Sequence, residues 1–318
     1  MQPFFRRAFL SIGLTAALVA SAQTANPITL LEPFPPGGAT DQLARVVAQK
    51  LTEQQGLVVN VDNRPGGGSQ IAVNVLRQAP ADGSTLFMGD IGAFSLNRHL
   101  YRKLSYNVDA DLQPISLVGK APLFVMVPKG SPFQSLGDLI AAGRNGELSY
   151  GSPGVGTGAH VAAEMLRART GIKLNHVPYR GAAPALVDLA GGQLAFVFDP
   201  LASSGPLLKD GRIRPLAVAT PQRSKLMPDL PTVAEGGAPG VNFVAWFGIA
   251  AKAGTPPDVV QRLNRQIGEA ISSPDVVKRF ADIGIEIAPS SVEGFGQLIK
   301  ADALAYEPVI KALDINLD

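Results

Sequence analysis

The sequence predicts an α/β fold made of two units of parallel sheet, each covered by helices on both faces. Short β-rich runs alternate with segments whose apolar residues recur at helical spacing, and this alternation starts afresh in the middle of the chain. The 318 residues include 34 glycines and 26 prolines, which suits the many tight turns of such a chain. With 46% hydrophobic residues, the chain is long and apolar enough for two cores.

Residues 1–22 are expected to be a signal peptide. Arg6 and Arg7 precede an apolar stretch at residues 10–19, and Ala20-Ser21-Ala22 supplies the small residues that signal peptidase requires. The apolar stretch is shorter than the roughly 20 residues that cross a bilayer, so a membrane anchor is the weaker interpretation. We therefore expect cleavage before Gln23 and export to the periplasm.

The first unit is expected to contain three strands separated by two helices. The strands are expected at residues 28–31, 57–61 and 85–88. The first helix follows a turn rich in proline and glycine, and it carries Leu43, Val47 and Leu51 on one face. A second helix is expected from about Gln70, after the loop at residues 63–68.

The second unit repeats this alternation and is followed by a helical C-terminal part. Its strands are expected at residues 123–127, 148–151, 174–179, 194–198 and 216–219, and a further strand at residues 243–250. Three helices should close the chain, since Pro256-Pro257-Asp258, Ser273-Pro274-Asp275 and Ser291 are typical helix starts.

Charge and composition exclude several classes of partner and site. The chain has 28 Lys+Arg and 26 Asp+Glu, and loss of Arg6 and Arg7 with the signal peptide leaves equal numbers of each sign. No basic field remains to attract nucleic acid or an anionic membrane surface. The absence of cysteine excludes disulfides, thiolate metal sites and a cysteine nucleophile. Any anion must therefore be bound through local geometry.

Three strand-to-helix turns share a design that suits an anion. They lie at residues 35–41, 152–158 and 179–183, and each places glycine just before a helix. The first amides of a helix are unpaired and the helix dipole is positive there, so such a terminus attracts anions. In open α/β sheets these turns lie at the carboxyl ends of the strands, where ligands bind. Each turn alone is also compatible with an ordinary helix cap, but together they indicate a small carboxylate held by neutral donors.

Common enzyme motifs are missing from the sequence. There is no Gly-x-Ser-x-Gly and no Gly-x-x-x-x-Gly-Lys-Ser/Thr, and Gly154-x-Gly156-x-Gly158 lacks the dinucleotide spacing. The three histidines, His99, His160 and His176, form none of the usual metal-binding pairs. We therefore expect no catalytic residue, no metal and no cofactor. A periplasmic hydrolase or isomerase is the alternative that the residues favour least.

Several single residues allow two interpretations. Asp199 ends an apolar strand, where it could cap the next turn or contact a donor of a ligand or an ordered water. His160 lies near the start of a helix and could touch a ligand or pack in the core. Arg180 lies beside a candidate carboxylate site. Arg64 is more typical of a loop ion pair, and Trp246 is more typical of a core residue.

At these same turns the chain resembles the tripartite tricarboxylate transporter receptors, also called Bug proteins. The resemblance is carried by PFPPGGATD at residues 33–41, NRPG at 63–66, ADGSTL at 81–86, HVPYRGAAPAL at 176–186, LPTVAE at 230–235, WFG at 246–248 and GTP at 254–256. These segments occur in order and cover essentially the whole mature chain, so the match is far more specific than any single motif.

The resemblance implies a type II periplasmic binding fold, in which two lobes are joined by crossover strands. The crossings would lie near residues 123–127 and 243–250. Lobe 1 would comprise residues 23–122 and 245–318, and lobe 2 residues 123–244. The implied function is that of a Venus-flytrap receptor that closes on a carboxylate and presents it to membrane transporter subunits. An orphan receptor acting through a sensor is the alternative. We expect a monomer with no nucleic-acid partner.

The resemblance also implies where the ligand binds. Carried over residue by residue, it selects Pro36, Gly38, Thr40, Ser152, Gly154, Thr157, Ala182 and Asp199. Further candidates are Gly68, Ser69, Asp90, His160 and Arg180. Gly67-Gly68-Ser69 departs from the Ala-Gly-Gly pattern common in the family, and residues 90–94 match no family pattern, so their contacts stay open. An Asp90 that faces the cleft would favour ligands bearing an ammonium or hydroxyl group over plain diacids.

The identity of the carboxylate is not specified by these residues. Main-chain amides bind a carboxylate whatever it is attached to. Citrate-like acids, C4 to C6 diacids, acidic amino acids, nicotinate and aromatic acids are therefore all compatible with the sequence.

Overall fold

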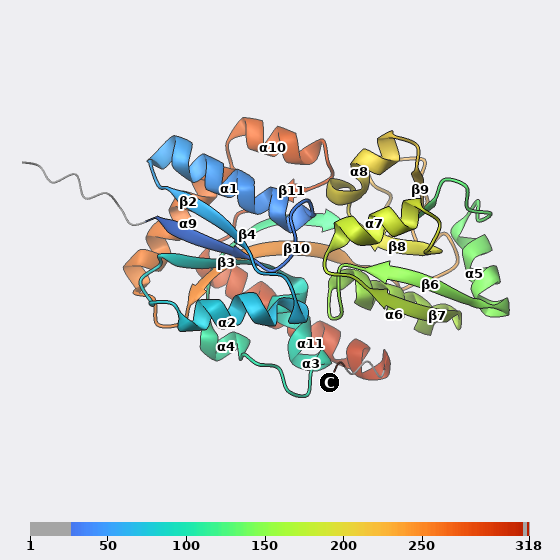
Figure 1. Ribbon diagram of the computed structural model, residues 1–318, viewed down its shortest axis with the longest axis horizontal. Helices are drawn as coiled ribbons and strands as arrows, with labels where there is room; N and C mark the ends of the chain where they lie inside the picture. The colour runs from blue at the N-terminus through green and yellow to red at the C-terminus, as the bar shows by residue number, and fades with distance from the viewer. Residues whose placement is uncertain (1–26, 314–316, 318) are drawn as a thin grey trace, which may run out of the picture.

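The computed structural model describes residues 27–313 and 317, so the expected signal peptide lies outside the described residues. The described residues form two β-sheets with helices packed around them, which confirms the α/β class (Figure 1). No helix within these residues combines the length and the apolar character needed to cross a bilayer.

The larger sheet has six strands in the order β11-β4-β10-β3-β1-β2. Its strands are β1 (Ile28–Glu32), β2 (Val59–Asn63), β3 (Thr85–Asp90), β4 (Leu112–Pro122), β10 (Val244–Lys252) and β11 (Glu286–Ile287). Strand β1 is parallel to β2 and β3, whereas β10 is antiparallel to β3 and β4. The expectation of purely parallel sheets is therefore wrong, because apolar periodicity carries no information about strand direction.

The smaller sheet has five strands in the order β7-β6-β8-β5-β9. They are β5 (Phe124–Pro128), β6 (Glu147–Ser152), β7 (Lys173–Pro178), β8 (Phe196–Asp199) and β9 (Ile213–Val218). Strands β6, β7 and β8 are parallel, and β5 is antiparallel to β8 and β9. In Figure 1 this sheet lies on the right and the six-stranded sheet on the left.

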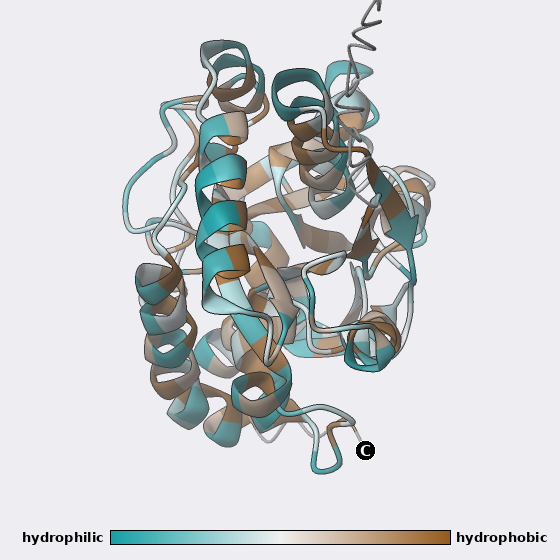
Figure 2. Ribbon diagram, turned by 90° about the vertical axis from the view of Figure 1, so that its left-hand side faces the viewer, coloured by the Kyte–Doolittle hydropathy of each residue, from teal (hydrophilic) through white to brown (hydrophobic). Residues whose placement is uncertain are grey.

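Helices surround the six-stranded sheet. They are α1 (Ala39–Gln55), α2 (Gln70–Gln78), α3 (Asn97–Leu100), α4 (Val108–Asp111), α9 (Pro257–Ile271), α10 (Pro274–Ala281) and α11 (Val292–Leu313), with the short turns η1 (Gly67–Ser69) and η2 (Gly92–Leu96). Helix α1 forms as predicted: Leu43, Val47 and Leu51 are buried, and Gly56 ends the helix in the left-handed conformation. In Figure 2 the outer faces of the helices are hydrophilic and their inner faces hydrophobic.

The five-stranded sheet is packed against four further helices. They are α5 (Leu136–Asn145), α6 (Gly158–Thr170), α7 (Ala182–Ala190) and α8 (Leu201–Lys209). Ser135 caps α5 in a capping box with Asp138, which satisfies donors at the start of that helix.

Strand β10 has one face toward a cavity between the two sheets and the other face toward the core. Its side chains alternate between two faces, as in any strand. Ala245 and Phe247 line a cavity between the two sheets. On the opposite face Trp246 is buried and donates a hydrogen bond from Nε1 to Asp302 of α11. Strand β10 therefore forms a wall of the cavity on one side and packs against α11 on the other.

Candidate functional site

A cavity of about 60 Å³ lies between the two sheets, at the ends of β1, β3, β6 and β8. Both halves of the molecule form its wall. The side of the six-stranded sheet contributes Phe34, Gly38, Ala39, Thr40, Asp90, Ala245 and Phe247. The side of the five-stranded sheet contributes Leu123, Pro153, Thr157, Gly158, Ala159, Ala182, Phe198, Asp199, Pro200 and Ser203. This described wall contains no lysine, arginine or histidine.

Four of the described helices, α1, α6, α7 and α8, begin at this wall. Within residues 27–313 and 317, the amides of Ala39 and Thr40 in α1 and of Gly158 and Ala159 in α6 donate no hydrogen bond. Free amides and aligned helix dipoles give the cavity a positive potential without a charged side chain. The arrangement can therefore bind an anion through main-chain amides of both halves.

The start of α1 is organised by side chains that face away from the cavity. Asp41 accepts hydrogen bonds from the Gly37 amide and from Arg45, with which it forms an ion pair at 2.9 Å. Asn63 donates to the same carboxylate. Because Arg45 balances the charge of Asp41, the acidic residue in the first turn does not cancel the attraction of the free amides for an anion.

The turn before α6 is held by two stacked histidines, of which His160 is buried and His176 partly buried. The rings of His160 and His176 stack with centroids 4.2 Å apart. Nδ1 of His160 accepts a hydrogen bond from the Gly156 amide, and Nε2 of His176 lies 2.7 Å from Oγ of Ser152. Burial lowers the pKa of His160 to about 4, so the ring is neutral at pH 7 and can accept this bond. His160 and Ser152 thus shape the turn and lie outside the cavity wall.

Two carboxyl groups border the cavity from opposite halves. Asp90 ends β3 and accepts a hydrogen bond from the Ala93 amide, and Asp199 ends β8 and accepts one from the Ser203 hydroxyl. Burial raises the pKa of Asp90 to about 6 and that of Asp199 to about 7. Each carboxyl thus binds a donor in the helical segment that follows it and also belongs to the cavity wall. Asp199 therefore lies at the start of α8 and in the cavity wall, and its contact with a ligand stays a prediction.

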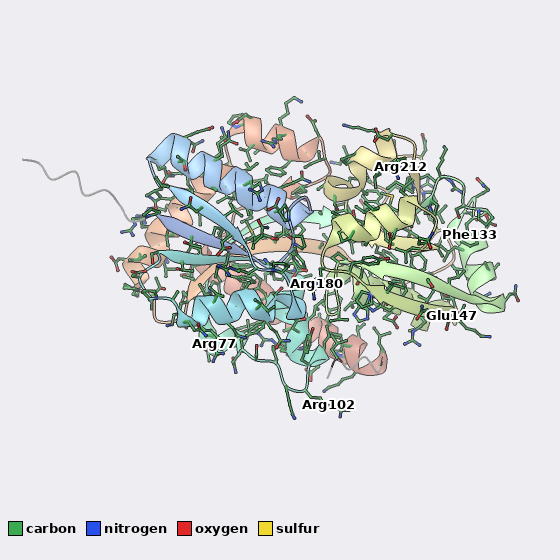
Figure 3. The ribbon with its side chains drawn as sticks, viewed as in Figure 1. Arg77, Arg102, Phe133, Glu147, Arg180 and Arg212 are labelled. Carbon is green, nitrogen blue, oxygen red and sulfur yellow. The ribbon has the colours of Figure 1, made fainter. Side chains whose placement is uncertain are left out.

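A second cavity of about 370 Å³ adjoins the first and shares Phe34, Pro153 and Thr157 with it. The glycine-rich loops of both halves surround it. Of the predicted residues, Gly68, Ser69, Gly154 and Arg180 line this outer cavity. Figure 3 shows Arg180 between the two halves of the molecule.

The structure thus divides the predicted site residues into three groups. Gly38, Thr40, Asp90, Thr157, Ala182 and Asp199 line the inner cavity. Gly68, Ser69, Gly154 and Arg180, together with Thr157, line the outer cavity. Pro36, Ser152 and His160 line neither of the two. Arg64 forms an exposed ion pair with Asp62, and Trp246 lies in the core, as expected for both.

The start of α8 was missed by the sequence reasoning. Pro200 and Ser203 belong to the wall, but no glycine precedes this helix, and only glycine marked the other three turns. The usable signal was the Asp199-Pro200 pair at the end of an apolar strand, because proline is typical of a helix start.

Within the described part of the chain, no cluster of three or more His, Asp or Glu side chains could hold a metal ion.

The two halves touch each other around the cavity. Nε2 of Gln42 in α1 donates a hydrogen bond of 2.7 Å to the carbonyl of Ala202 in α8. Glycines allow close approaches between the halves: a Cβ added to Gly92 would lie 2.7 Å from the carbonyl oxygen of Gly156. A Cβ added to Gly181 would lie 2.7 Å from Cδ of Pro35. The cavity walls are therefore in direct contact across the boundary between the halves.

Glu32, at the end of β1, makes the stability of the protein depend on pH. Its side chain is fully buried, and burial raises its pKa to about 8. In the unfolded chain a glutamate ionises near pH 4.5, so between pH 4.5 and 8 the folded state binds one proton more. We therefore expect the free energy of unfolding to fall as pH rises from 5 to 8. The contribution of Glu32 is at most about 1.4 kcal/mol per pH unit.

The Glu32→Gln variant should lose this contribution and show a flatter profile of unfolding free energy against pH. Urea denaturation at pH 5, 6, 7 and 8 measures both slopes. The same substitution at the exposed Glu147 serves as a control and should leave the slope as in the wild type. Equal slopes for the wild type and Glu32→Gln would contradict the prediction.

The chain is similar to known proteins of one family. The model of a family described as tripartite tricarboxylate transporter family receptor matches residues 43–315. Protein BugT of Bordetella pertussis (strain Tohama I) is 36% identical over 289 residues, which are 89% of this chain and 89% of BugT.

Two solved structures have the same fold along almost the whole chain. Rpa4515 of R. palustris, solved with adipate, has a TM-score of 0.89 and 36% identity, and the match covers 93% of this chain and 100% of that chain. MatC (Rpa3494) of Rhodopseudomonas palustris, solved with bound malate, has a TM-score of 0.83 and 27% identity, with 89% and 98% covered.

Proposed function

The chain belongs to the family of tripartite tricarboxylate transporter receptors, and from this premise we propose that it captures a small organic carboxylate between two lobes and delivers it to membrane subunits of a transporter. The family consists of periplasmic solute-binding receptors and is not a family of enzymes. The α/β fold with two lobes is likewise that of the solved relatives. The single observation that carries the proposal is the cavity at which four helices begin.

The proposed contacts of the carboxylate follow from the geometry of the inner cavity. The free amides of Ala39 and Thr40 approach it from α1, and those of Gly158 and Ala159 approach it from α6. Charge-assisted hydrogen bonds of this kind contribute ~1.5–3 kcal/mol each. Three or four of them can supply the roughly −8 kcal/mol of a micromolar complex after the ordering costs.

The rest of the ligand extends into the outer cavity under this proposal. The two cavities meet at Phe34, Pro153 and Thr157, so a chain of a few carbons can continue from one to the other. Arg180 borders the outer cavity and would face the distal end of the ligand. Adipate and malate in the relatives are both diacids, and a diacid would place its second carboxylate on this side.

Capture requires that the ligand bind both lobes, because contacts with one lobe alone do not shift an equilibrium between open and closed forms. We assign residues 23–122 and 245–318 to lobe 1 and residues 123–244 to lobe 2. In support, the strands of the six-stranded sheet fall almost wholly in the first set, and those of the five-stranded sheet fall in the second. Export of the mature chain as a monomer to the periplasm completes the proposal.

A thermal-shift screen of small carboxylates tests the receptor function. Diacids of four to six carbons, citrate, acidic amino acids, nicotinate and benzoate make up the panel. A cognate acid should raise the melting temperature by several degrees at 100 times its Kd, because binding to the folded state alone adds about 2.7 kcal/mol at that concentration. A panel without any shift would count against the carboxylate class.

Thr40→Val tests the site with the acid that shifts the melting temperature most. Thr40 is buried and lines the inner cavity, and valine keeps its shape but removes the hydroxyl. We expect Kd to rise about tenfold, the effect of one lost hydrogen bond of ~1.4 kcal/mol. Thr52→Val, about 18 Å further along the same helix, is the matched control and should bind as the wild type does. Unchanged affinity in Thr40→Val would contradict the assignment of the site.

A further inference from the structure

Asp90 and Asp199 lie in surroundings that do not balance their charge. The side chain of Asp90 belongs to a residue that is 8% exposed, and Asp199 is 2% exposed. Neither carboxyl forms an ion pair with a lysine or arginine of the described residues. Buried carboxylates without a cationic partner are costly unless donors surround them. The donors present are backbone amides at Asp90 and serine groups at Asp199.

Both carboxyls retain capacity to accept another hydrogen bond from the cavity. An ionised carboxylate offers about four acceptor sites. The bonds to Asp90 come from the start of η2, and those to Asp199 come from the first turn of α8, so both sets of donors lie on one side of each carboxyl. Both residues also belong to the cavity wall. The remaining acceptor capacity is therefore directed at whatever occupies the cavity.

The other polar groups of the wall have the opposite character. The hydroxyl of Thr40 and the amides at the starts of α1 and α6 are donors that a ligand carboxylate can use. The hydroxyls of Thr157 and Ser203 already donate within the protein, to the Gly154 carbonyl and to Asp199. The two aspartates are the carboxyl side chains of this described wall. A plain carboxylate beside them brings a like charge into a buried space. A hydroxyl or ammonium group on the adjacent carbon would instead satisfy them.

We propose that Asp90, opposite Asp199, selects ligands that carry a hydrogen-bond donor, a hydroxyl or an ammonium group, close to the carboxylate bound by the helix starts. This inference rests on the proposed function and names the substrate class of the same cavity. The helix starts of α1 and α6 hold the carboxylate, and the two aspartates hold the donor. Closure of the lobes brings the two carboxyls, one from each lobe, around that donor.

Matched acids that differ in one substituent test the inference. The sets are succinate, malate and aspartate; glutarate, 2-hydroxyglutarate and glutamate; and adipate and 2-aminoadipate. Titration calorimetry at pH 8 measures Kd for each acid. In the set that binds most tightly, a substituted member should bind at least about tenfold more tightly than the unsubstituted one. An unsubstituted diacid that binds within about threefold of its substituted partners would overturn the inference but support the proposed function.

Asp90→Asn separates the role of the charge from that of the shape. Asparagine keeps an oxygen that can accept from the Ala93 amide, so the cap at η2 persists. The preference for the ammonium-bearing acid is the Kd of the unsubstituted acid divided by the Kd of the ammonium-bearing one. This ratio should fall at least about tenfold in the variant. Asp302→Asn is the matched control, because Asp302 is partly buried and accepts from Trp246 on the other face of β10, outside the cavity wall. Its preference should equal that of the wild type.

A second variant keeps the inference testable if Asp90→Asn is unstable. Asp199→Asn removes the opposite charge and should reduce the same preference, with circular dichroism and the melting temperature reporting on the fold. A preference that survives in both folded variants would overturn the inference. If no acid in any set binds to the wild type, the inference is overturned. The proposed function is wrong as well only if citrate, nicotinate and benzoate also give no shift in melting temperature.

Discussion

Replacing Gly92 with alanine is expected to weaken ligand binding at least about 100-fold. Gly92 opens η2 directly behind the cavity, and a Cβ at this position would lie 2.7 Å from the carbonyl oxygen of Gly156 in the other half. The obstacle is backbone, which cannot rotate away as a flexible side chain can. The lobes of the variant should stop short of full contact, so the ligand would lose bonds from one lobe. A loss of ~2.7 kcal/mol corresponds to the expected change in Kd.

The folding of each lobe should be unaffected by this substitution. Gly92 does not have a positive φ, so alanine fits its backbone without strain. Gly296→Ala, in α11 with no atom within 4 Å of the added Cβ, is the control and should bind ligand as the wild type does.

Small-angle scattering distinguishes blocked closure from local damage at Asp90, whose carboxylate oxygen would lie 3.1 Å from the new Cβ. Blocked closure predicts that saturating ligand no longer compacts Gly92→Ala, although it compacts Gly296→Ala. A Gly92→Ala protein that binds within about threefold of the wild type, with the same compaction, would show that closure does not need this contact.

The elements around the cavity were predictable where residues that are neighbours in the sequence determine their structure. Helix α1 has a one-sided apolar face and a glycine at each end, and both signals depend only on neighbours along the chain. The turns before α6 and α7 were predictable for the same reason, since glycine precedes the free amides of both helices. The features on which the proposed anion binding rests are therefore local ones that the sequence contains.

Features that depend on contacts between distant segments could not be predicted. Strand β4 has no regular alternation because two irregularities shift its register against β10, and it was missed. The π-helical turn η2 follows Asp90 without any sequence signal, and it fixes the direction of that carboxyl. The close approach of Gly92 to Gly156 joins η2 to the turn before α6, which lie in different halves of the molecule. A single sequence does not reveal which of its 34 glycines meet in this way.

Replacing Phe94 with alanine is expected to lower the free energy of unfolding by about 3–5 kcal/mol, the cost of removing a fully buried aromatic ring. Phe94 lies in η2, and its ring contacts three others, with centroid distances of 5.6 Å to Phe87, 5.9 Å to Trp246 and 5.3 Å to Phe295. These rings come from β3, β10 and α11, so the cluster joins the elements that hold Asp90 and Phe247 at the cavity. Its loss should therefore loosen the wall of lobe 1 as well as its core.

Urea denaturation followed by tryptophan fluorescence measures this effect, because Trp246 is the single tryptophan of the chain and belongs to the cluster. Phe94→Leu, which leaves a smaller cavity, should lose less than Phe94→Ala. Leu304→Ala, at a position on α11 that is 70% exposed, should change the unfolding free energy by no more than about 0.5 kcal/mol. A loss below about 1 kcal/mol in Phe94→Ala would mean that the neighbouring rings collapse into the space, and that the cavity wall does not depend on this residue.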